Sequence, residues 1–301
     1  MIYLATVEHH PYTPRDVLNS IIKIRTSKRG VPIMLLRSKK FFILFIILFI
    51  PSLLLSQDSR VLNQILKSGE LRVGTSGSQP PFTMKSKEGQ LMGYEVELAK
   101  LLTDAMNLKL TFVEKPFSEL LPALEKREID VIMSGMTITP ERNLKFTFVG
   151  PYVVSGKSIL VKSKRLSALD EMSEINRPTI TVAALKGSTS QFFVEKLAPK
   201  VKLVATTDYE TAVKMVLEDK VDIMVADYPI CVLSILRHPD AGLATLEPPL
   251  TIEPIGIALP PDAFQLHNLV ENYLNALEIG GVLENLEAKW FQDGSWLIRL
   301  P

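Results

Sequence analysis

The sequence predicts an α/β fold made of two similar lobes. One observation is a repeated unit, an amphipathic helix followed by a short apolar strand, which occurs at 117–133 and again at 209–225. A helix that leads directly into a buried strand is half of a βαβ crossover, so two such units indicate two open sheets. The other observation is size, because 301 residues with 47% apolar content are enough for two hydrophobic cores.

The individual elements follow from their apolar patterns. The segments FSELLPALEK and YETAVKMVLEDK each place apolar residues on one helical face. The strands are expected to be short, apolar and rich in β-branched residues, as buried strands of α/β sheets are. We therefore expect helices at 117–126 and 209–220, and strands at 129–133, 179–185 and 221–225.

The N-terminal region differs from the rest of the chain. Three basic residues precede an apolar run at 41–55, and the small residue Ser56 follows it, which is the layout of a cleaved secretory signal peptide. We expect this signal at 34–56, a true start at Met34, and a mis-called or disordered extension at 1–33. An uncleaved N-terminal helix that anchors the protein is the alternative, although the run is shorter than the roughly 20 residues of a spanning helix.

Charge and cysteine content exclude several classes of function. Without residues 1–56 the chain carries 26 basic and 31 acidic residues, a net charge of −5, which gives no electrostatic basis for nucleic-acid binding. Cys231 is the single cysteine, so we expect no internal disulfide and a thiol packed among apolar residues. The histidines that follow the N-terminal segment have no metal-ligand spacing. We expect neither a metal nor a cofactor.

The segment VIMSGMTITPER at 131–142 has the features of a carboxylate site. Gly135 lets a ligand approach backbone N–H groups, and Ser134 and Thr137 add hydroxyls. A Thr-Pro pair then predicts a helix start. Arg142 falls in its first turn, where the helix dipole disfavours a cation by roughly 0.3–1 kcal/mol unless an anion is bound. Free N–H groups and a guanidinium fork together suit a carboxylate. The alternative is a surface loop with a solvated arginine.

Two further strand ends carry polar residues. Ligands of open α/β sheets bind at the carboxyl ends of the strands. Lys186, Ser188 and Thr189 follow the strand at 179–185, and Asp227 follows the strand at 221–225 as an acceptor for an ammonium group. Together with the arginine these residues suit a zwitterion. Asp227 is alternatively a helix cap.

Phe117 lies at the start of the first predicted helix and provides a candidate apolar wall for a ligand. A lone aromatic residue on a helix face is alternatively part of the core.

From about residue 71 to residue 291 the chain resembles the family 3 extracellular solute-binding proteins, the amino-acid receptors of ABC importers. The resemblance is carried by LRVGT at 71–75, GYEVELA at 93–99, the loop just described, GPY at 150–152 and KWF at 289–291. It implies a two-lobed fold of the type II periplasmic binding proteins, in which each lobe is a mixed sheet with flanking helices. Lobe 1 would comprise 57–151 and 256–301, and lobe 2 would comprise 157–250, with hinge crossovers at 152–156 and 251–255.

The resemblance also implies roles for individual residues. Arg142 would clamp the α-carboxylate of the ligand and Asp227 would take its α-amino group. Phe117 would cover the ligand. The remaining contacts would come from Gly135 and Thr137 in lobe 1 and from Ser188 and Thr189 in lobe 2.

Two residues depart from the pattern of the family. Ser76 stands where receptors for basic amino acids and for glutamine carry an aspartate, and Gln79 stands where an aromatic residue is frequent. We therefore expect a small neutral or polar amino acid as the ligand. The family further implies a periplasmic monomer that works with an ABC permease.

A related group of exported enzymes, the cyclohexadienyl dehydratases, is the alternative. The segments INRP at 175–178 and HP at 238–239 resemble their sequence. These enzymes act on prephenate or arogenate and need a general acid. The resemblance places their glutamate at Gln191, whose amide cannot deliver a proton as a carboxylic acid can. The sequence therefore favours binding over catalysis.

Overall fold

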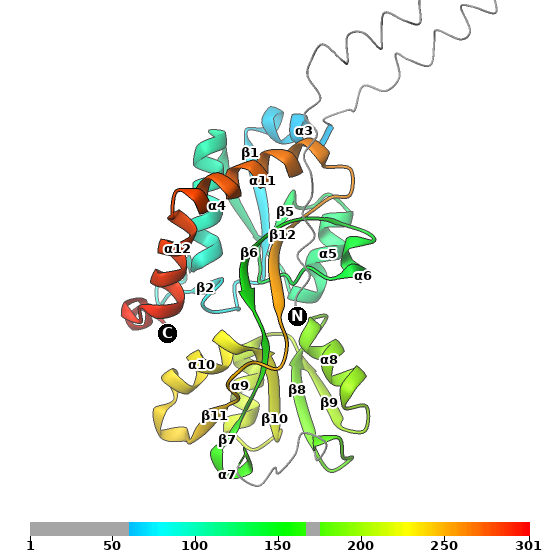
Figure 1. Ribbon diagram of the computed structural model, residues 1–301, viewed down its shortest axis with the longest axis vertical. Helices are drawn as coiled ribbons and strands as arrows, with labels where there is room; N and C mark the ends of the chain where they lie inside the picture. The colour runs from blue at the N-terminus through cyan, green and yellow to red at the C-terminus, as the bar shows by residue number, and fades with distance from the viewer. Residues whose placement is uncertain (1–59, 167–174) are drawn as a thin grey trace, which may run out of the picture. The chain divides into compact units, whose positions relative to one another are not determined.

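The computed structural model describes residues 60–166 and 175–301 (Figure 1). The described residues form one compact unit. The predicted extension at 1–33, the start at Met34 and the signal peptide at 34–56 lie outside the described residues. Within the described ranges, no helix combines the length and the apolar composition needed to cross a bilayer.

The first sheet has five strands in the order β4-β1-β5-β12-β6. β1 runs parallel to β4 and β5, whereas β12 runs antiparallel to β5 and β6. We call this sheet with its helices lobe 1. Its strands are β1 (Glu70–Thr75), β4 (Lys109–Glu114), β5 (Val131–Ile132), β6 (Thr147–Ser155) and β12 (Glu253–Leu259).

The helices of lobe 1 cover the sheet, and a small hairpin of β2 (Met84–Lys85) and β3 (Leu91–Met92) follows β1. The C-terminal part of the chain returns to this lobe and packs its apolar side chains into the same core. The helices are α3 (Arg60–Ser68), α4 (Tyr94–Met106), α5 (Phe117–Glu125), α6 (Pro140–Asn143), α11 (Phe264–Ile279), α12 (Val282–Glu287), the π-helical turn η4 (Ala288–Gln292) and the 3-10 helix η5 (Ser295–Arg299).

The second sheet has the order β11-β7-β10-β8-β9, and we call this sheet with its helices lobe 2. β8 is parallel to β9 and β10, and β7 is antiparallel to β10 and β11. Its strands are β7 (Lys157–Lys162), β8 (Thr181–Leu185), β9 (Lys202–Thr206), β10 (Ile223–Asp227) and β11 (Leu243–Thr245). Its helices are α7 (Ser163–Leu166), α8 (Thr189–Leu197), α9 (Tyr209–Leu217), α10 (Tyr228–Arg237) and the 3-10 helix η3 (Pro239–Ala241).

The predicted fold class, two α/β lobes with mixed sheets, is confirmed. The helices expected at 117–126 and 209–220 are α5 and α9, each slightly shorter than predicted. The strand expected at 221–225 is instead Ile223–Asp227, because Asp222 uses its carboxylate to accept the N–H of Thr181 at 2.7 Å. Asp130 does the same for the N–H of Arg72 at 2.8 Å in lobe 1. The strand expected at 129–133 is accordingly reduced to Val131–Ile132.

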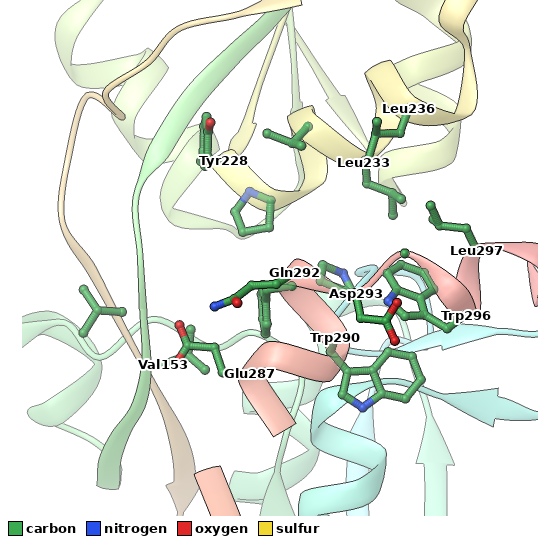
Figure 2. Close-up of a pocket in the computed structure, with 16 residues that line it drawn as sticks. Val153, Tyr228, Leu233, Leu236, Glu287, Trp290, Gln292, Asp293, Trp296 and Leu297 are labelled. Carbon is green, nitrogen blue, oxygen red and sulfur yellow. The ribbon is translucent and has the colours of Figure 1, made fainter. Parts of the chain in front are cut away.

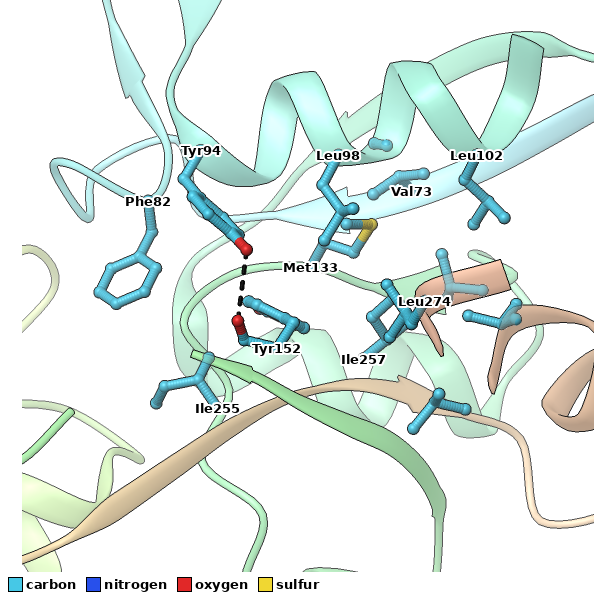
Figure 3. Close-up of a cluster of buried hydrophobic side chains, with 14 of the residues drawn as sticks. Val73, Phe82, Tyr94, Leu98, Leu102, Met133, Tyr152, Ile255, Ile257 and Leu274 are labelled. Atoms are coloured by element: carbon cyan, nitrogen blue, oxygen red, sulfur yellow. Dashed lines mark hydrogen bonds between the residues drawn. The ribbon is translucent and has the colours of Figure 1, made fainter. Parts of the chain in front are cut away.

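The chain passes between the lobes along β6 and β12, which pair with each other over the segments predicted as hinges (Figure 1). Ser155 pairs with Glu253 at the end of this ladder. Beside it lies part of the lobe 1 core, where the rings of Tyr94 and Tyr152 stack with centroids 5.7 Å apart. The Tyr94 hydroxyl donates to the Tyr152 carbonyl at 3.3 Å (Figure 3). The first crossover is thus fixed to α4, and bending at 152–156 and 251–255 stays a prediction.

Candidate functional site

Three of the predicted site residues, Thr137, Thr189 and Arg142, lie where the two lobes touch. The hydroxyls of Thr137 in lobe 1 and Thr189 in lobe 2 are 3.3 Å apart. Arg142 Nη2 donates to the carbonyl of Gly187, in lobe 2, at 3.3 Å. Both contacts join the segment that follows β5 to the segment that follows β8. The carboxyl ends of these two strands therefore face each other, as expected for a site between two lobes.

Arg142 is positioned by a single helical turn. Thr139 is its N-cap and accepts the N–H of Arg142 at 3.2 Å, as the Thr-Pro pair predicts. The helix comprises only four residues, so few peptide dipoles are aligned. The expectation that a helix dipole prepares an anion site here is therefore wrong. The evidence for a ligand at Arg142 must come from its side chain.

Arg142 is half-buried, and its guanidinium donates to two backbone carbonyls. Nη1 donates to the carbonyl of Thr137 at 2.7 Å, in addition to the contact with Gly187. Burial lowers the pKa of Arg142 to about 10, because the charged form loses water. A carboxylate would be a stronger partner for this cation than neutral carbonyls are.

Phe117 is a core residue, which was one of the two alternatives for it, and its role in covering a ligand stays a prediction. It is buried in a core cluster with Leu120 and Met136. The Cζ atom of Arg142 also lies 5.9 Å from the centroid of the Phe117 ring, within the range of a cation–π contact. The ring therefore supports the guanidinium from the core side.

Ser76, Gln79 and Ser134 bond to one another, and their contact with a ligand stays a prediction. Gln79 Oε1 accepts the Ser134 hydroxyl at 2.9 Å and the Ser76 hydroxyl at 3.3 Å. Gly135 has a φ of 57°, and a Cβ there would lie 2.9 Å from Gln79 Nε2. Only glycine fits without strain or displacement.

The N–H of Gly135 was expected to be free for a ligand, but it already has an acceptor. It donates to Glu95 Oε1 at 2.7 Å, so the glycine is fixed from behind, and its contact with a ligand stays a prediction. Glu95 lies in the first turn of α4 and is fully buried. Burial raises its pKa to about 7. The sequence analysis assigned no role to Glu95, although it shares a helical face with Leu98 and Leu102.

In lobe 2 the hydroxyl that reaches the lobe interface is that of Thr189. Ser188 is the N-cap of α8, and its hydroxyl accepts the N–H of Gln191 at 3.2 Å and donates to the carbonyl of Leu185 at 2.7 Å. Lys186 is exposed. The Gln191 side chain accepts the N–H of Gly187 at 2.8 Å, so it braces the loop.

Asp227 is paired with a lysine that the sequence analysis did not single out. It occupies the N-cap position of α10 without a side-chain cap bond. Lys157 Nζ lies 2.6 Å from its Oδ1, and the two side chains are 1% and 3% exposed. Lys157 also lies 3.5 Å from Glu253 Oε2, at the start of β12. One feature of the sequence could have indicated Lys157: it stands between Gly156 and the apolar residues of a strand.

The ammonium-binding role of Asp227 stays a prediction, because one of its oxygens already has a cation. Tyr209 adds a buried hydroxyl to this region, and its pKa is raised by burial and by the charge of Asp227. Within the described ranges, no three His, Cys, Asp or Glu residues form a group that could hold a metal ion.

A cavity of about 280 Å³ lies between the lobes, and none of the predicted site residues lines it. Figure 2 shows Leu233 and Leu236 of α10 facing Trp296 and Leu297 of the C-terminal segment across it. Val153 of the first crossover also lines it. The helix α10, which begins directly after Asp227, therefore has one end at the predicted ligand site and a side against this cavity.

Known proteins are similar to this chain in sequence and fold. The family model of the bacterial extracellular solute-binding proteins, family 3, matches residues 71–293. The cyclohexadienyl dehydratase of Pseudomonas aeruginosa is 27% identical over 79% of this chain and 88% of its own. The L-arginine-binding protein of the same species is 30% identical over 73% of this chain and 87% of its own.

Solved structures agree with the fold. An ancestral amino acid-binding protein, a precursor of cyclohexadienyl dehydratase, has a TM-score of 0.71 at 34% identity and covers 77% of this chain and 99% of its own. A putative binding component of an ABC transporter from Wolinella succinogenes, in complex with lysine, has a TM-score of 0.72 at 33% identity over 76% of this chain and 99% of its own. The extent of the match leaves one conclusion: this chain belongs to the family 3 bacterial extracellular solute-binding proteins.

Proposed function

We propose that this protein captures a small neutral or polar amino acid between its two lobes and presents it to an ABC permease. The observation that carries the proposal is the position of the Arg142 guanidinium, which donates to the carbonyl of Thr137 in lobe 1 and to the carbonyl of Gly187 in lobe 2. Among the hydrogen bonds described, these neutral carbonyls are its acceptors. A ligand carboxylate at this point would gain charge-assisted bonds and would hold both lobes. Binding would therefore favour a closed state.

The charges around Asp227 support a ligand that also carries an ammonium group. Lys157 is one cation between two carboxylates, those of Asp227 and Glu253. This group of three carries one net negative formal charge, and Arg142 also interacts electrostatically with both carboxylates. A ligand carboxylate that takes Arg142 as its partner would leave that negative charge to the ligand's ammonium group, so an amino acid would supply both charges.

The wall predicted to face the ligand side chain supports a neutral or polar ligand. Ser76, Gln79 and Ser134 offer hydroxyl and amide groups that satisfy one another. A lysine or arginine side chain placed there would meet no carboxylate from these three residues. This distinguishes our proposal from the arginine and lysine ligands of the relatives.

An exported prephenate or arogenate dehydratase is the second candidate, because one relative is a cyclohexadienyl dehydratase. The Gln191 amide weighs against it. Its oxygen accepts the N–H of Gly187, and its nitrogen donates to Glu195 Oε1 at 2.8 Å. An amide in these bonds has no proton to give to a leaving hydroxyl.

Export is part of the proposal. We propose a periplasmic protein, released by cleavage after the signal peptide at 34–56, with an uncleaved N-terminal anchor as the alternative. N-terminal sequencing of the protein from cells would distinguish them, because a first residue near Gln57 indicates cleavage. Sedimentation would test the proposed monomer.

A thermal-shift screen of amino acids, dicarboxylates and prephenate tests the function. A ligand at a hundred times its Kd adds about 2.7 kcal/mol to the free energy of unfolding, so a neutral or polar amino acid should raise the Tm by several degrees. No shift with any amino acid would overturn the proposal. Prephenate incubated with the protein should stay intact, and phenylpyruvate formed at a catalytic rate would favour the dehydratase.

A further inference from the structure

Glu253 is a buried carboxylate beside the predicted carboxylate site, and the sequence analysis assigned no ligand contact to it. It is the first residue of β12 and is 9% exposed. The next residues of β12 pair with the segment that follows β5. The N–H of Ile138 donates to the carbonyl of Pro254 at 2.8 Å. Thr137 forms an isolated bridge with Ile255. Glu253 therefore stands directly before the strand positions that hold the ligand segment.

The two oxygens of the Glu253 side chain have different partners. Oε1 accepts the hydroxyl of Thr251 at 3.0 Å, and Oε2 lies 3.5 Å from Lys157 Nζ. The Thr251 hydroxyl also accepts the backbone N–H of Lys157 at 2.9 Å. One threonine thus holds the carboxylate and the lysine beside each other.

Lys157 serves two carboxylates unequally. Its Nζ atom lies 2.6 Å from Asp227 Oδ1, against 3.5 Å from Glu253 Oε2. The shorter contact is a charge-assisted hydrogen bond, and the longer one exceeds the usual range of such bonds. Lys157 therefore compensates Asp227 first, and the charge of Glu253 is the one in excess.

The charge of Glu253 also reaches Arg142. Burial lowers the pKa of Arg142, while Glu253 and Asp227, in that order of strength, favour its charged form. Together with Lys157 these side chains carry two positive and two negative formal charges. An amino acid adds one charge of each sign and keeps the balance. A carboxylate ligand without an ammonium group adds only a negative charge.

We propose that Glu253 is a specificity-determining residue, which makes the site select a carboxylate ligand that also carries an ammonium group. The inference rests on the proposed function, because it needs a ligand whose carboxylate takes Arg142 as its partner. A ligand ammonium at Asp227 competes with Lys157 for the same carboxylate. Glu253 then offers Lys157 a second acceptor, so neither cation lacks a counter-charge in a largely buried place.

Removal of the Glu253 charge should reverse this selectivity. In Glu253→Gln the three remaining charged side chains carry one net positive charge. An acid without an amino group would neutralise that charge. An amino acid would leave it in place, and its ammonium group would share Asp227 with Lys157. The variant should therefore bind the acid more tightly than the wild type does, and the amino acid more weakly.

The experiment compares two probes by thermal shift at neutral pH. One is an equimolar mixture of L-alanine, L-serine, L-threonine, L-asparagine and L-glutamine, and the other is a mixture of the matching acids without the α-amino group. The measured quantity is the half-maximal concentration of the acids divided by that of the amino acids. This ratio should fall about ten-fold or more in Glu253→Gln, because the loss of one member of a buried charge group typically has at least this effect.

Three further variants separate the charge of Glu253 from its structural contacts. Glu218→Gln removes a carboxylate that pairs with Lys220 at the surface, so its ratio should equal that of the wild type. Thr251→Val removes a bond to Glu253 but keeps the charge, so its ratio should stay well above that of Glu253→Gln. The double variant Lys157→Met/Glu253→Gln loses one charge of each sign, so its preference should return to the amino acids. Ratios that follow the stability of the variants rather than their charge would overturn the proposal.

The outcomes separate the two proposals. If the wild type responds to the amino acids and Glu253→Gln keeps the wild-type ratio, the role of Glu253 is wrong and the proposed function stands. If neither mixture shifts the Tm of the wild type, or the wild type prefers the acids, both proposals are overturned. If Glu253→Gln fails to fold, Glu253→Met fills the same buried space without a polar group, and its ratio gives the same decision.

Discussion

Lys157 and Asp227 form an ion pair of 2.6 Å across two antiparallel strands, with both side chains almost completely buried. The pair lies at the first residue of β7 and the last residue of β10. It links the residue predicted to bind the ligand ammonium to the point where the chain enters lobe 2. The removal of Lys157 and the removal of Asp227 should therefore differ in their effects on stability and on ligand binding.

Replacement of Lys157 by methionine should lower the free energy of unfolding by about 3–5 kcal/mol, because it leaves Asp227 buried without its cation. Chemical denaturation at neutral pH measures this loss. Lys162→Met is the control on the same strand, since Lys162 pairs with Asp219 at the surface and such pairs contribute about 0–1 kcal/mol. Equal losses for the two variants would contradict the importance of the buried pair.

Replacement of Asp227 by asparagine should weaken the binding of an amino acid more than that of the matching acid without an amino group. The reason is that only the amino acid presents an ammonium to the carboxylate. Calorimetric titration with both compounds gives the two ratios. Equal weakening would make Asp227 a structural residue that only holds Lys157.

Replacement of Arg142 by alanine should cost about 2–5 kcal/mol of ligand affinity, because a partly buried carboxylate would lose its cation. The affinity is measured by calorimetry with the ligand found in the screen. Arg127→Ala is a suitable control, because Arg127 pairs with Asp262 on the exposed surface. Unchanged affinity in the Arg142 variant would remove this residue from the site.

Replacement of Gly187 by alanine should disfavour the closed state. A Cβ at Gly187 would lie 3.0 Å from Ser118 Cβ, in the opposite lobe, and the φ of 76° adds backbone strain. Gly242→Ala is matched for strain, with a φ of 62°, but a Cβ there meets no atom within 4 Å. Both variants should lose about 1–2 kcal/mol of stability because of the backbone strain. Only Gly187→Ala should also bind the ligand more weakly. Its radius of gyration should not decrease when the ligand binds. Equal affinities would show that the lobes do not close at this point.

The elements of the fold were predictable because their signals are local. The periodicity of α5 and α9 and the apolar runs of β8 and β10 each lie within about ten residues. The aspartates before β5 and β10 also belonged to the repeated pattern. Their role as acceptors for Arg72 and Thr181 needed the neighbouring strand and could not be derived from the pattern.

The site was predictable only in part, for the same reason. Arg142, Thr137 and Thr189 stood beside strand ends, where α/β sheets bind ligands. Glu95 and Lys157 did not, and a glutamate or lysine in a sequence is normally an exposed residue. Their partners are 40 and 70 residues away along the chain. The Gly135 N–H was predicted to be free because its acceptor, Glu95, lies far away in the sequence, on α4.

The position of Cys231 allows the opening of α10 to be measured by thiol labelling of the native chain. It is the single cysteine of the sequence, and it is buried in α10, the helix that begins after Asp227 and borders the cavity between the lobes. Burial raises the pKa of its thiol to about 12, so a thiol reagent can react only during transient opening of this helix. The rate of labelling would therefore measure how often α10 separates from its sheet. It would do so in an unmodified sequence.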